Sequence, residues 1–386
     1  MSETGGGGRP RPRRLDRLPE QYFAALLGRI AAAAADGGPP IVDLGRGNPE
    51  TGPPDHVVEA LKDAAARPDG HGYAPFRGLP ALRAAIANRY RTEYDVEVDP
   101  DREVAVIPGG KQAIFELALA LGEGGRTILL PDPYYPDYPS GIALAGAETG
   151  LVPLDPAAGW QPSLDEVPPA AALYLNFPSN PCAVCAHAGV FDAAVAYSAR
   201  TGSPIVHDAA YIDLVFDGRS PASFLAAPGA KEAGVELWTM SKTYGMAGWR
   251  IAFVLGNAEI VERLNLIGDH SRVGMLAALQ HAAIAALEGP EDSVLQRRAA
   301  YERRRSRLAS VLPEPPVCEG SFYVWLRLPS GITPELLLTE HRVALAPGEG
   351  FGPSGAGWAR LSLAVTDEVF EEGVARLAPV LEAAYA

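Results

Sequence analysis

Seven short apolar runs, most of them separated by helical stretches, constrain the fold of this chain more than any other feature. Runs of this kind predict buried strands, and their alternation with helices is typical of a parallel sheet that is covered on both faces. The predicted strands are residues 103–107, 126–130, 150–154, 171–176, 204–208, 235–240 and 250–255. The sequence therefore predicts an α/β fold with one large seven-stranded sheet.

The last two runs are separated only by residues 241–249. A parallel crossover needs about a dozen residues or more, so we expect the final strand to run antiparallel in a mostly parallel sheet. Asn180, Asp208 and Lys242 lie at or just after the carboxyl ends of predicted strands. Open α/β sheets bind ligands at that edge, so we expect these three residues to share one site.

The segment SKTYGMAGWR, residues 241–250, places Lys242 directly after a predicted strand. A lysine whose surroundings lower its pKa can form a Schiff base with a carbonyl compound such as pyridoxal phosphate. Thr239, Ser241 and Arg250 offer hydroxyls and a guanidinium that suit a phosphate group. Because a lysine in a loop is more often an ordinary surface residue, this interpretation depends on the rest of the site.

Two other strand ends carry groups that a pyridoxal ring requires. The carboxylate of Asp208, in HDAAY, can keep the pyridine nitrogen protonated, which makes the ring an electron sink. Tyr211 and Asn180 can donate hydrogen bonds to the ring oxygen. Taken alone, Asp208 is better explained as a helix cap, and Asn180 as a turn residue before proline.

A Gly-Gly turn at residues 109 and 110 follows the first predicted strand and precedes a helix with apolar residues at 114, 117, 118 and 121. The free amides and positive dipole at a helix start attract anions. The turn matches neither a GxGxxG fingerprint nor a P-loop, and GRGNPETG near the start also lacks the dinucleotide spacing. Taken alone, the turn is therefore only a weak signal for a phosphate site.

Eleven motifs, in the same order along the chain, resemble those of the class I/II aminotransferases, a family of fold type I pyridoxal phosphate enzymes. They are RLDRLPEQYFAALLGRI, VDLGRGNPETGPP, GYAPFRGLPALRAAIANRY, IPGGKQAIFELAL, PDPYYPDY, NFPSNP, HDAAY, SKTYGMAGWR, GSFYVWLRL, APGEGFG and ARLSLA. The resemblance implies a homodimeric enzyme with pyridoxal 5'-phosphate as its cofactor. Its reaction would be a ping-pong transfer of an amino group between an L-amino acid and a 2-oxo acid.

The resemblance also implies roles for single residues. Lys242 would form the Schiff base and move the substrate proton, Asp208 would pair with the pyridine nitrogen, and Tyr211 would complete the catalytic set. The phosphate would be bound by Gly110, Lys111, Thr239, Ser241 and Arg250, and the ring oxygen would be contacted by Asn180. Tyr135, or its rivals Tyr134 and Tyr138, would stack on the ring face. The substrate carboxylate would be bound by Arg360, Gly47 and Asn180, and Tyr73 would reach the phosphate of the partner chain.

One motif departs from the family pattern. The usual Asn-Pro-Thr-Gly turn reads NPCA at residues 180–183, which keeps Asn180 but changes the turn that follows it. The change creates a CxxC pair, Cys182 and Cys185, which in isolation suggests metal or redox chemistry. The remaining cysteine is Cys318, so four thiolates cannot be assembled and we expect no metal.

A chain of 386 residues fits about two domains. We expect a flexible tail at residues 1–14, an N-terminal segment at 15–55 that joins the small domain, a large cofactor-binding domain at 56–285, and a small α/β domain at 286–386. In the small domain, FYVWLRL, VALA and ARLSLA would form a second sheet beyond a helix that carries YERRRSRL. Arg360 and Lys242 would then come from different domains, which closure on a substrate would bring together.

The composition agrees with an intracellular enzyme, and we expect it in the cytoplasm. A net charge of -14 disfavours nucleic acid as a partner, and three cysteines argue against a disulfide framework. No apolar run reaches the length of a membrane span, and the basic start lacks the apolar core of a secretory signal.

Three functions remain open: amino-group transfer, another pyridoxal phosphate reaction such as beta elimination, oxidation or cyclisation, and a non-catalytic cofactor-binding or interaction protein. The lysine, aspartate and arginine set argues against the third, and the resemblance favours the first. The NPCA turn leaves room for a specialised biosynthetic substrate. Candidates for side-chain specificity are Tyr22, Phe23, Tyr323 and residues 269–272. Residues 269–272 would face either the active site, where Arg272 would suit an acidic substrate and Asp269 a basic one, or the partner chain. The alternative for these four residues is an interdomain helix with solvated charges.

Overall fold

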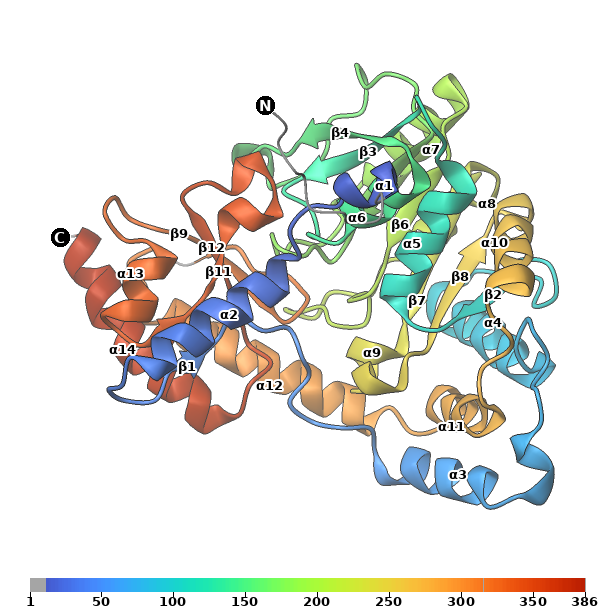
Figure 1. Ribbon diagram of the computed structural model, residues 1–386, viewed down its shortest axis with the longest axis horizontal. Coiled ribbons are helices and arrows are strands. Elements are labelled where there is room, and N and C mark those ends of the chain that lie inside the picture. Colours follow the sequence, from blue (N-terminus) through green and yellow to red (C-terminus); the bar gives the residue numbers. More distant parts are fainter. Residues whose placement is uncertain (1–11, 315, 386) are drawn as a thin grey trace, which may run out of the picture.

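A seven-stranded sheet occupies the centre of the larger part of the molecule (Figure 1). The computed structural model describes residues 12–314 and 316–385, and in it the strand order is β2-β8-β7-β6-β5-β3-β4. The strands are β2 (Val104–Ile107), β3 (Thr127–Asp132), β4 (Glu148–Pro153), β5 (Ala172–Asn176), β6 (Ile205–Asp208), β7 (Gly234–Thr239) and β8 (Ala252–Gly256). All neighbours are parallel except β8, which is antiparallel to both β7 and β2. The predicted strands and the antiparallel direction of the last one are confirmed.

Helices cover both faces of this sheet because its side chains alternate between two apolar cores. Val235 and Leu237 of β7 pack with α5, α6 and α10, whereas Trp238 packs on the opposite face with α4, α7 and α8. Helices α3 and α11 pack on each other beyond this second face (Figure 1). The bounds are α3 (Asp55–Ala65), α4 (Pro80–Tyr94), α5 (Gly110–Leu121), α6 (Tyr138–Ala145), α7 (Val190–Thr201), α8 (Ala230–Ala233), α9 (Met240–Thr243), α10 (Ala258–Ser271) and α11 (Ala277–Glu288).

A second apolar core holds the C-terminal part, at the left of Figure 1. It contains the antiparallel sheet β11-β12-β9, made of β9 (Tyr323–Arg327), β11 (Ala346–Pro347) and β12 (Trp358–Ser362), together with α13 (Pro334–Thr339) and α14 (Asp367–Tyr385). The N-terminal segment joins this part through β1 (Val42–Asp43), which pairs in parallel with β10 (Val343–Ala344). The expectation that VALA lies wholly in the second sheet is wrong, because its first half pairs with β1 and only Ala346 reaches β11.

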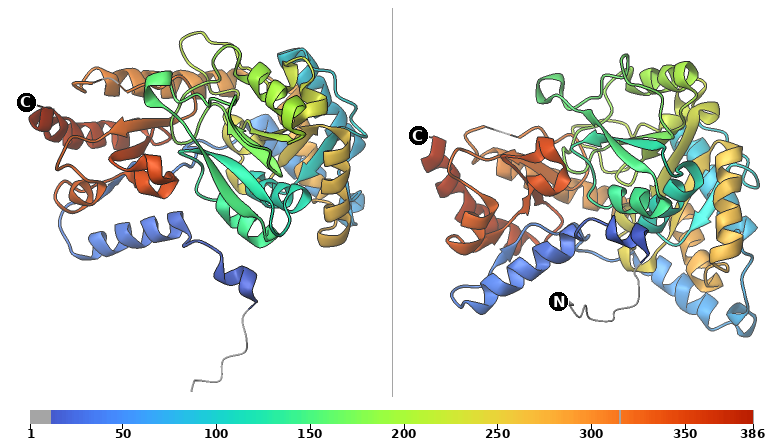
Figure 2. Two further views of the ribbon diagram at one scale, coloured as in Figure 1. Left: turned by 90° about the horizontal axis from the view of Figure 1, so that it is seen from above. Right: turned by 45° about the horizontal axis from the view of Figure 1, so that its top comes forward.

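Helix α12 (Asp292–Ala309) carries the YERRRSRL segment and extends from the larger part to the smaller one (Figure 1). Helix α2 (Tyr22–Ala35) lies along one side of the molecule, and the short α1 (Arg13–Asp16) precedes it (Figure 2). Of the predicted tail, residues 1–11 lie outside the described part of the chain. No helix in residues 12–314 and 316–385 has both the length and the apolar character that a membrane span requires.

Candidate active site

A cavity of about 390 Å³ lies at the carboxyl ends of β5, β6 and β7, beside the N-terminal segment. Its position follows from the topology, because parallel neighbours end at the same edge of a sheet. Most of the predicted site residues line it, namely Gly47, Gly110, Lys111, Tyr135, Asn180, Asp208, Tyr211, Thr239, Ser241, Lys242 and Arg250. The sheet thus brings together residues that are far apart in the sequence.

Lys242 lies on α9, a single turn of helix that starts where β7 ends. Thr239 caps this turn, since its hydroxyl accepts a hydrogen bond from the Ser241 amide at 3.2 Å. The Lys242 amine donates to the Gly47 carbonyl at 2.8 Å. Burial lowers the pKa of Lys242 to about 7, with help from the positive charges of Arg360 and Arg250 and against the pull of Asp208. A large fraction of the amine is therefore neutral near pH 7, as a nucleophile or a base must be.

Asp208 ends β6 and is buried at the edge of the cavity. Its Oδ2 atom accepts a hydrogen bond from the Tyr138 hydroxyl at 2.7 Å, and its Oδ1 atom accepts one from the Ala210 amide at 3.1 Å. Burial raises the pKa of Asp208, although these hydrogen bonds oppose the effect. A carboxylate that is held in this way is oriented for a cationic partner such as a protonated ring nitrogen.

The phosphate end is built at the start of α5. Gly109 has a φ of +91°, and a side chain there would place its Cβ atom 2.2 Å from Nη2 of Arg250. Only glycine therefore allows the guanidinium to lie against this helix start. The hydroxyl oxygens of Thr239 and Ser241 lie 3.0 Å apart and line the same cavity. Free amides, the helix dipole, hydroxyls and a guanidinium together make an anion site.

Arg360, which was predicted to bind the substrate carboxylate, lies outside the cavity lining. It is fully buried and donates hydrogen bonds to Oδ1 of Asn180 at 2.8 Å and to the Gly45 carbonyl at 3.0 Å. The ring of Tyr323 lies 3.9 Å from the guanidinium carbon and does line the cavity. Tyr323 thus contacts both the guanidinium and the cavity.

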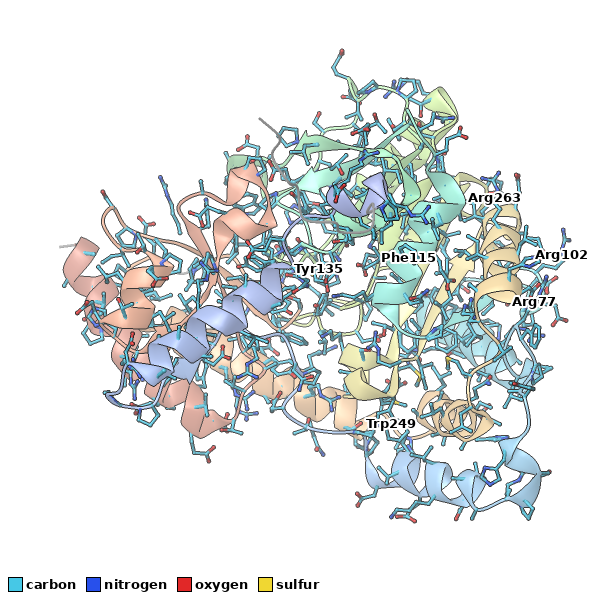
Figure 3. The ribbon with its side chains drawn as sticks, viewed as in Figure 1. Arg77, Arg102, Phe115, Tyr135, Trp249 and Arg263 are labelled. Carbon is cyan, nitrogen blue, oxygen red and sulfur yellow. The ribbon has the colours of Figure 1, made fainter. Side chains whose placement is uncertain are left out.

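Tyr135 lies where the N-terminal end of α2 approaches the sheet (Figure 3). Its hydroxyl donates to Asp137 at 2.6 Å, and the same carboxylate pairs with Lys111 at 2.8 Å. Of the two rival candidates, Tyr138 is buried against Asp208 and Tyr134 lines a separate hollow. Of these three tyrosines, Tyr135 is the one that lines the cavity.

A family model described as "Aminotransferase class I and II" matches residues 39–377. The chain belongs to this family. It is 40% identical over 376 residues to the L-glutamine--4-(methylsulfanyl)-2-oxobutanoate aminotransferase of Bacillus subtilis, with 94% of each chain covered. It is 39% identical over 366 residues to the glutamate-pyruvate aminotransferase AlaC of Escherichia coli, with 91% and 89% covered. The solved structure of substrate-bound BacF from Bacillus subtilis matches with a TM-score of 0.90 at 36% identity and covers 97% of this chain and 98% of its own.

As a class I/II aminotransferase, the protein is a fold type I enzyme that uses pyridoxal phosphate to move an amino group between an amino acid and a 2-oxo acid. The alternative pyridoxal phosphate reactions are not favoured. The cavity fits the cofactor, because Asp208, Lys242 and Arg250 offer partners for the ring nitrogen, the aldehyde and the phosphate.

Some predicted residues lie away from this cavity. Tyr73 is 87% exposed, and the Tyr22 hydroxyl donates to the Pro347 carbonyl beside a separate hollow. Arg272 pairs with the buried Glu116, and Asp269 pairs with Arg77. Residues 269–272 are thus not pocket residues within a single chain. They end α10, which packs on α5 and the large sheet, so the expected interdomain helix with solvated charges is also wrong. Phe23 and Tyr323, by contrast, line the cavity.

Two important residues of the aminotransferase site were not predicted in their roles. Asn176 ends β5 beside Asp208 in register, donates to the Asp208 carbonyl at 2.8 Å, and accepts from the Asn180 amide at 2.7 Å. Its position at a strand end was a usable signal, because the same criterion found Asp208. Tyr138 was considered only for ring stacking, and its bond to Asp208 depends on a contact across 70 residues.

The NPCA turn holds its shape without glycine. Ala183 has a φ of +59°, in the left-handed region, and its carbonyl accepts hydrogen bonds from the amides of Glu319 and Gly320. The three cysteines are free thiols, and burial raises the pKa of Cys185 to about 12. A thiol with such a pKa is protonated at neutral pH and is a poor nucleophile. In the part of the chain that the structure describes, no group of three or more His, Cys, Asp or Glu residues is placed to hold a metal.

Proposed function

We propose that Lys242, Asp208 and Tyr211 are the catalytic residues of this aminotransferase. The proposal rests above all on the Lys242 amine, which has a pKa of about 7 and lies in the cavity that Asp208 and Arg250 also line. Bound pyridoxal phosphate supplies a ring that stabilises negative charge at the substrate α carbon. Near neutral pH, a neutral Lys242 can take a proton from that carbon and return it at a different atom. Asp208 would hold the ring nitrogen, and Tyr211 would donate to the ring oxygen.

For cofactor binding we propose the residues around the start of α5 and the end of β7. Arg250, Thr239, Ser241 and the amides of Gly110 and Lys111 would hold the phosphate, and the apposition of Gly109 and Arg250 supports this. Tyr135 would lie on one face of the ring, and Asn180 would contact its oxygen.

For the substrate we propose that Arg360 binds the α-carboxylate, with Asn180 and the Gly47 backbone beside it. The bond from Arg360 to Asn180 supports this role, as does the Nε atom of Arg360, which has no hydrogen-bond partner among the described residues. Tyr323 would move aside as the carboxylate enters, because its ring covers the guanidinium. The apolar side chains of Phe23 and Leu27 on the cavity wall favour an uncharged substrate side chain for one of the two half-reactions.

We further propose that the enzyme is a cytoplasmic homodimer in which Tyr73 reaches the phosphate of the partner. Tyr73 and Phe76 are exposed, and the adjacent loop 273–276 also exposes apolar side chains. The two segments are in contact, since a Cβ atom on Gly274 would lie 2.3 Å from the Pro75 carbonyl oxygen. An exposed apolar patch of this kind is typical of an interface.

The names of the relatives suggest a donor of the glutamine or glutamate type and a 2-oxo acid acceptor in a specialised biosynthetic reaction. The test is a set of half-reactions with a panel of amino acids, in which conversion of the bound aldehyde to its amine form is followed by absorbance. We expect conversion by one class of donors and loss of the lysine-bound absorption in Lys242→Ala. Products other than the 2-oxo acid, or fixation of the cofactor by borohydride on another lysine, would refute the proposal.

A further inference from the structure

The buried carboxylate of Asp213 lies on the segment that follows β6, two residues after Tyr211. It accepts four hydrogen bonds from three different elements. Its Oδ1 atom accepts from Arg89 Nη2 at 2.8 Å and from the Tyr94 hydroxyl at 2.7 Å, both on α4. Its Oδ2 atom accepts from Trp238 Nε1 at 3.1 Å and from the Thr243 hydroxyl at 2.7 Å. Both oxygens of this carboxylate are therefore fully engaged.

Two of these donors flank the lysine segment. Trp238 is on β7, immediately before the capping Thr239, and Thr243 directly follows Lys242 on α9. A single helical turn has little stability of its own, so α9 depends on such tertiary contacts for its orientation. Arg89 adds another contact, because its Nη1 atom donates to the Tyr244 hydroxyl at 3.1 Å. Asp213 thus connects the Tyr211 segment to both ends of the lysine turn.

The ion pair between Asp213 and Arg89 is itself buried, with 5% of each side chain or less exposed. Burial alone would raise the pKa of Asp213, but Arg89 and the hydroxyl donors outweigh it and lower the pKa, so the carboxylate stays ionised. Buried ion pairs are often replaceable by apolar residues without loss of stability, so stability is a weak explanation for this one. The buried pair is better explained by the role of Asp213 in fixing the relative positions of several segments.

We propose that Asp213 is a positioning residue that fixes the Lys242 amine relative to Tyr211 during proton transfer. The inference rests on the proposed catalytic role of Lys242. Asp213 does not line the cavity, so it acts through Thr243 and Trp238 and not on the substrate. A misplacement of about 1 Å in a reacting group can cost about a hundredfold in rate, so small shifts of α9 are expected to matter.

The test compares Thr243→Val with Thr243→Ser in the holoenzyme. Valine keeps the shape of threonine but removes the donor to Asp213, and the other three donors remain, so the fold is expected to survive. We expect kcat to fall by roughly 10- to 100-fold and the KM of the amino donor to stay within about twofold. The pH at which the lysine-bound cofactor changes its absorption should also move. Serine keeps the hydroxyl and should restore kcat to within about threefold of the wild type and the pH transition to the wild-type value.

Asp213→Asn should lower kcat further, because it also removes the buried charge partner of Arg89 and leaves the guanidinium only the half-exposed Glu291, 2.8 Å from its Nη1 atom. Its matched control is Asp217→Asn, an exposed carboxylate nearby on the same segment that pairs with Arg305. The proposal is overturned if Thr243→Val lowers the melting temperature but leaves kcat and the pH transition unchanged. Failure of the proposed function would look different, because Lys242→Ala would then keep the lysine-bound absorption whatever the Thr243 variants do.

Discussion

At Lys242 the protein surrounds an amine with one neutral acceptor, the Gly47 carbonyl, and with the positive charges of Arg360 and Arg250. The pKa of about 7 in the folded state lies below the unfolded value of about 10.4. Between these pH values the unfolded chain binds more protons than the folded one, so the stability of the apoprotein rises with pH. Below about pH 7 the destabilising effect of this lysine reaches its full size.

We therefore predict that the free energy of unfolding of apo Lys242→Met exceeds that of the wild-type apoprotein. The difference should be on the order of several kcal/mol at pH 6 and should decrease as the pH approaches 10. Urea denaturation at several pH values measures this difference. Lys62→Met is the control, since Lys62 is exposed on α3 and its substitution should produce little change. If the difference in stability between Lys242→Met and the wild type does not depend on pH, the pKa of the Lys242 amine is not lowered in the folded state.

Arg360 is the second residue whose surroundings set its role. Its two bonded nitrogens face Asn180 and Gly45, and Tyr323 lies over its face. We predict that Arg360→Lys raises the KM values of the amino donor and of the 2-oxo acid together, by roughly 10- to 100-fold, because lysine cannot make the bidentate contact with their shared carboxylate. Steady-state kinetics with both substrates measures this effect. If Arg46→Lys has the larger effect, then Arg46, which lines the cavity, binds the carboxylate instead.

At the scale of elements, the start of α5 and the end of β7 are held together by the contact between Gly109 and Arg250. We predict that Gly109→Ala weakens pyridoxal phosphate binding by about tenfold or more, because the new methyl group displaces the guanidinium. Gly125→Ala is the matched control, since Gly125 also has a positive φ (+79°) but nothing lies within 4 Å of its Cβ position. Both variants carry backbone strain, and more at Gly109, because its φ of +91° and ψ of +155° lie in a region that is essentially restricted to glycine. Equal losses of cofactor affinity in the two variants would show that displacement of Arg250 contributes nothing.

The same elements explain how far the sequence could predict the site. Asp208 and Lys242 were predictable because each follows an apolar run, and parallel strands end at one edge. The burial of Arg360 behind Tyr323 was not predictable, because it depends on how β9 and β12 pack against the N-terminal segment. The hydrogen bonds of Asp213 were equally hidden, since its donors are between 25 and 124 residues away in the sequence. Local patterns indicate strands and turns, whereas such contacts arise only from tertiary packing.

At the scale of the molecule, α12 contacts three of the segments that surround the site. Arg297 on this helix donates to the Thr243 carbonyl, which follows Lys242, and to the Thr51 hydroxyl at 3.0 Å. Arg304, two turns later, donates to Glu50 at 2.7 Å and to the Leu363 carbonyl at 2.9 Å. One helix therefore connects the lysine turn, the N-terminal segment and the strand that carries Arg360.

Tyr73 is 87% exposed in the single chain, although its predicted partner is a phosphate group in a cavity. The two facts agree if the cavity belongs to a second chain. A mixed dimer of Tyr73→Phe and Lys242→Ala chains distinguishes the two arrangements. If Tyr73 acts across the interface, one site contains both Lys242 and the partner's tyrosine, and we predict about half of the wild-type cofactor sites at limiting pyridoxal phosphate. If Tyr73 acts within its own chain, no site is complete, and the mixed dimer binds no better than the Tyr73→Phe parent. Light scattering shows whether the chain dimerises, purification through a different affinity tag on each chain isolates the mixed dimer, and cofactor titration then decides between the arrangements.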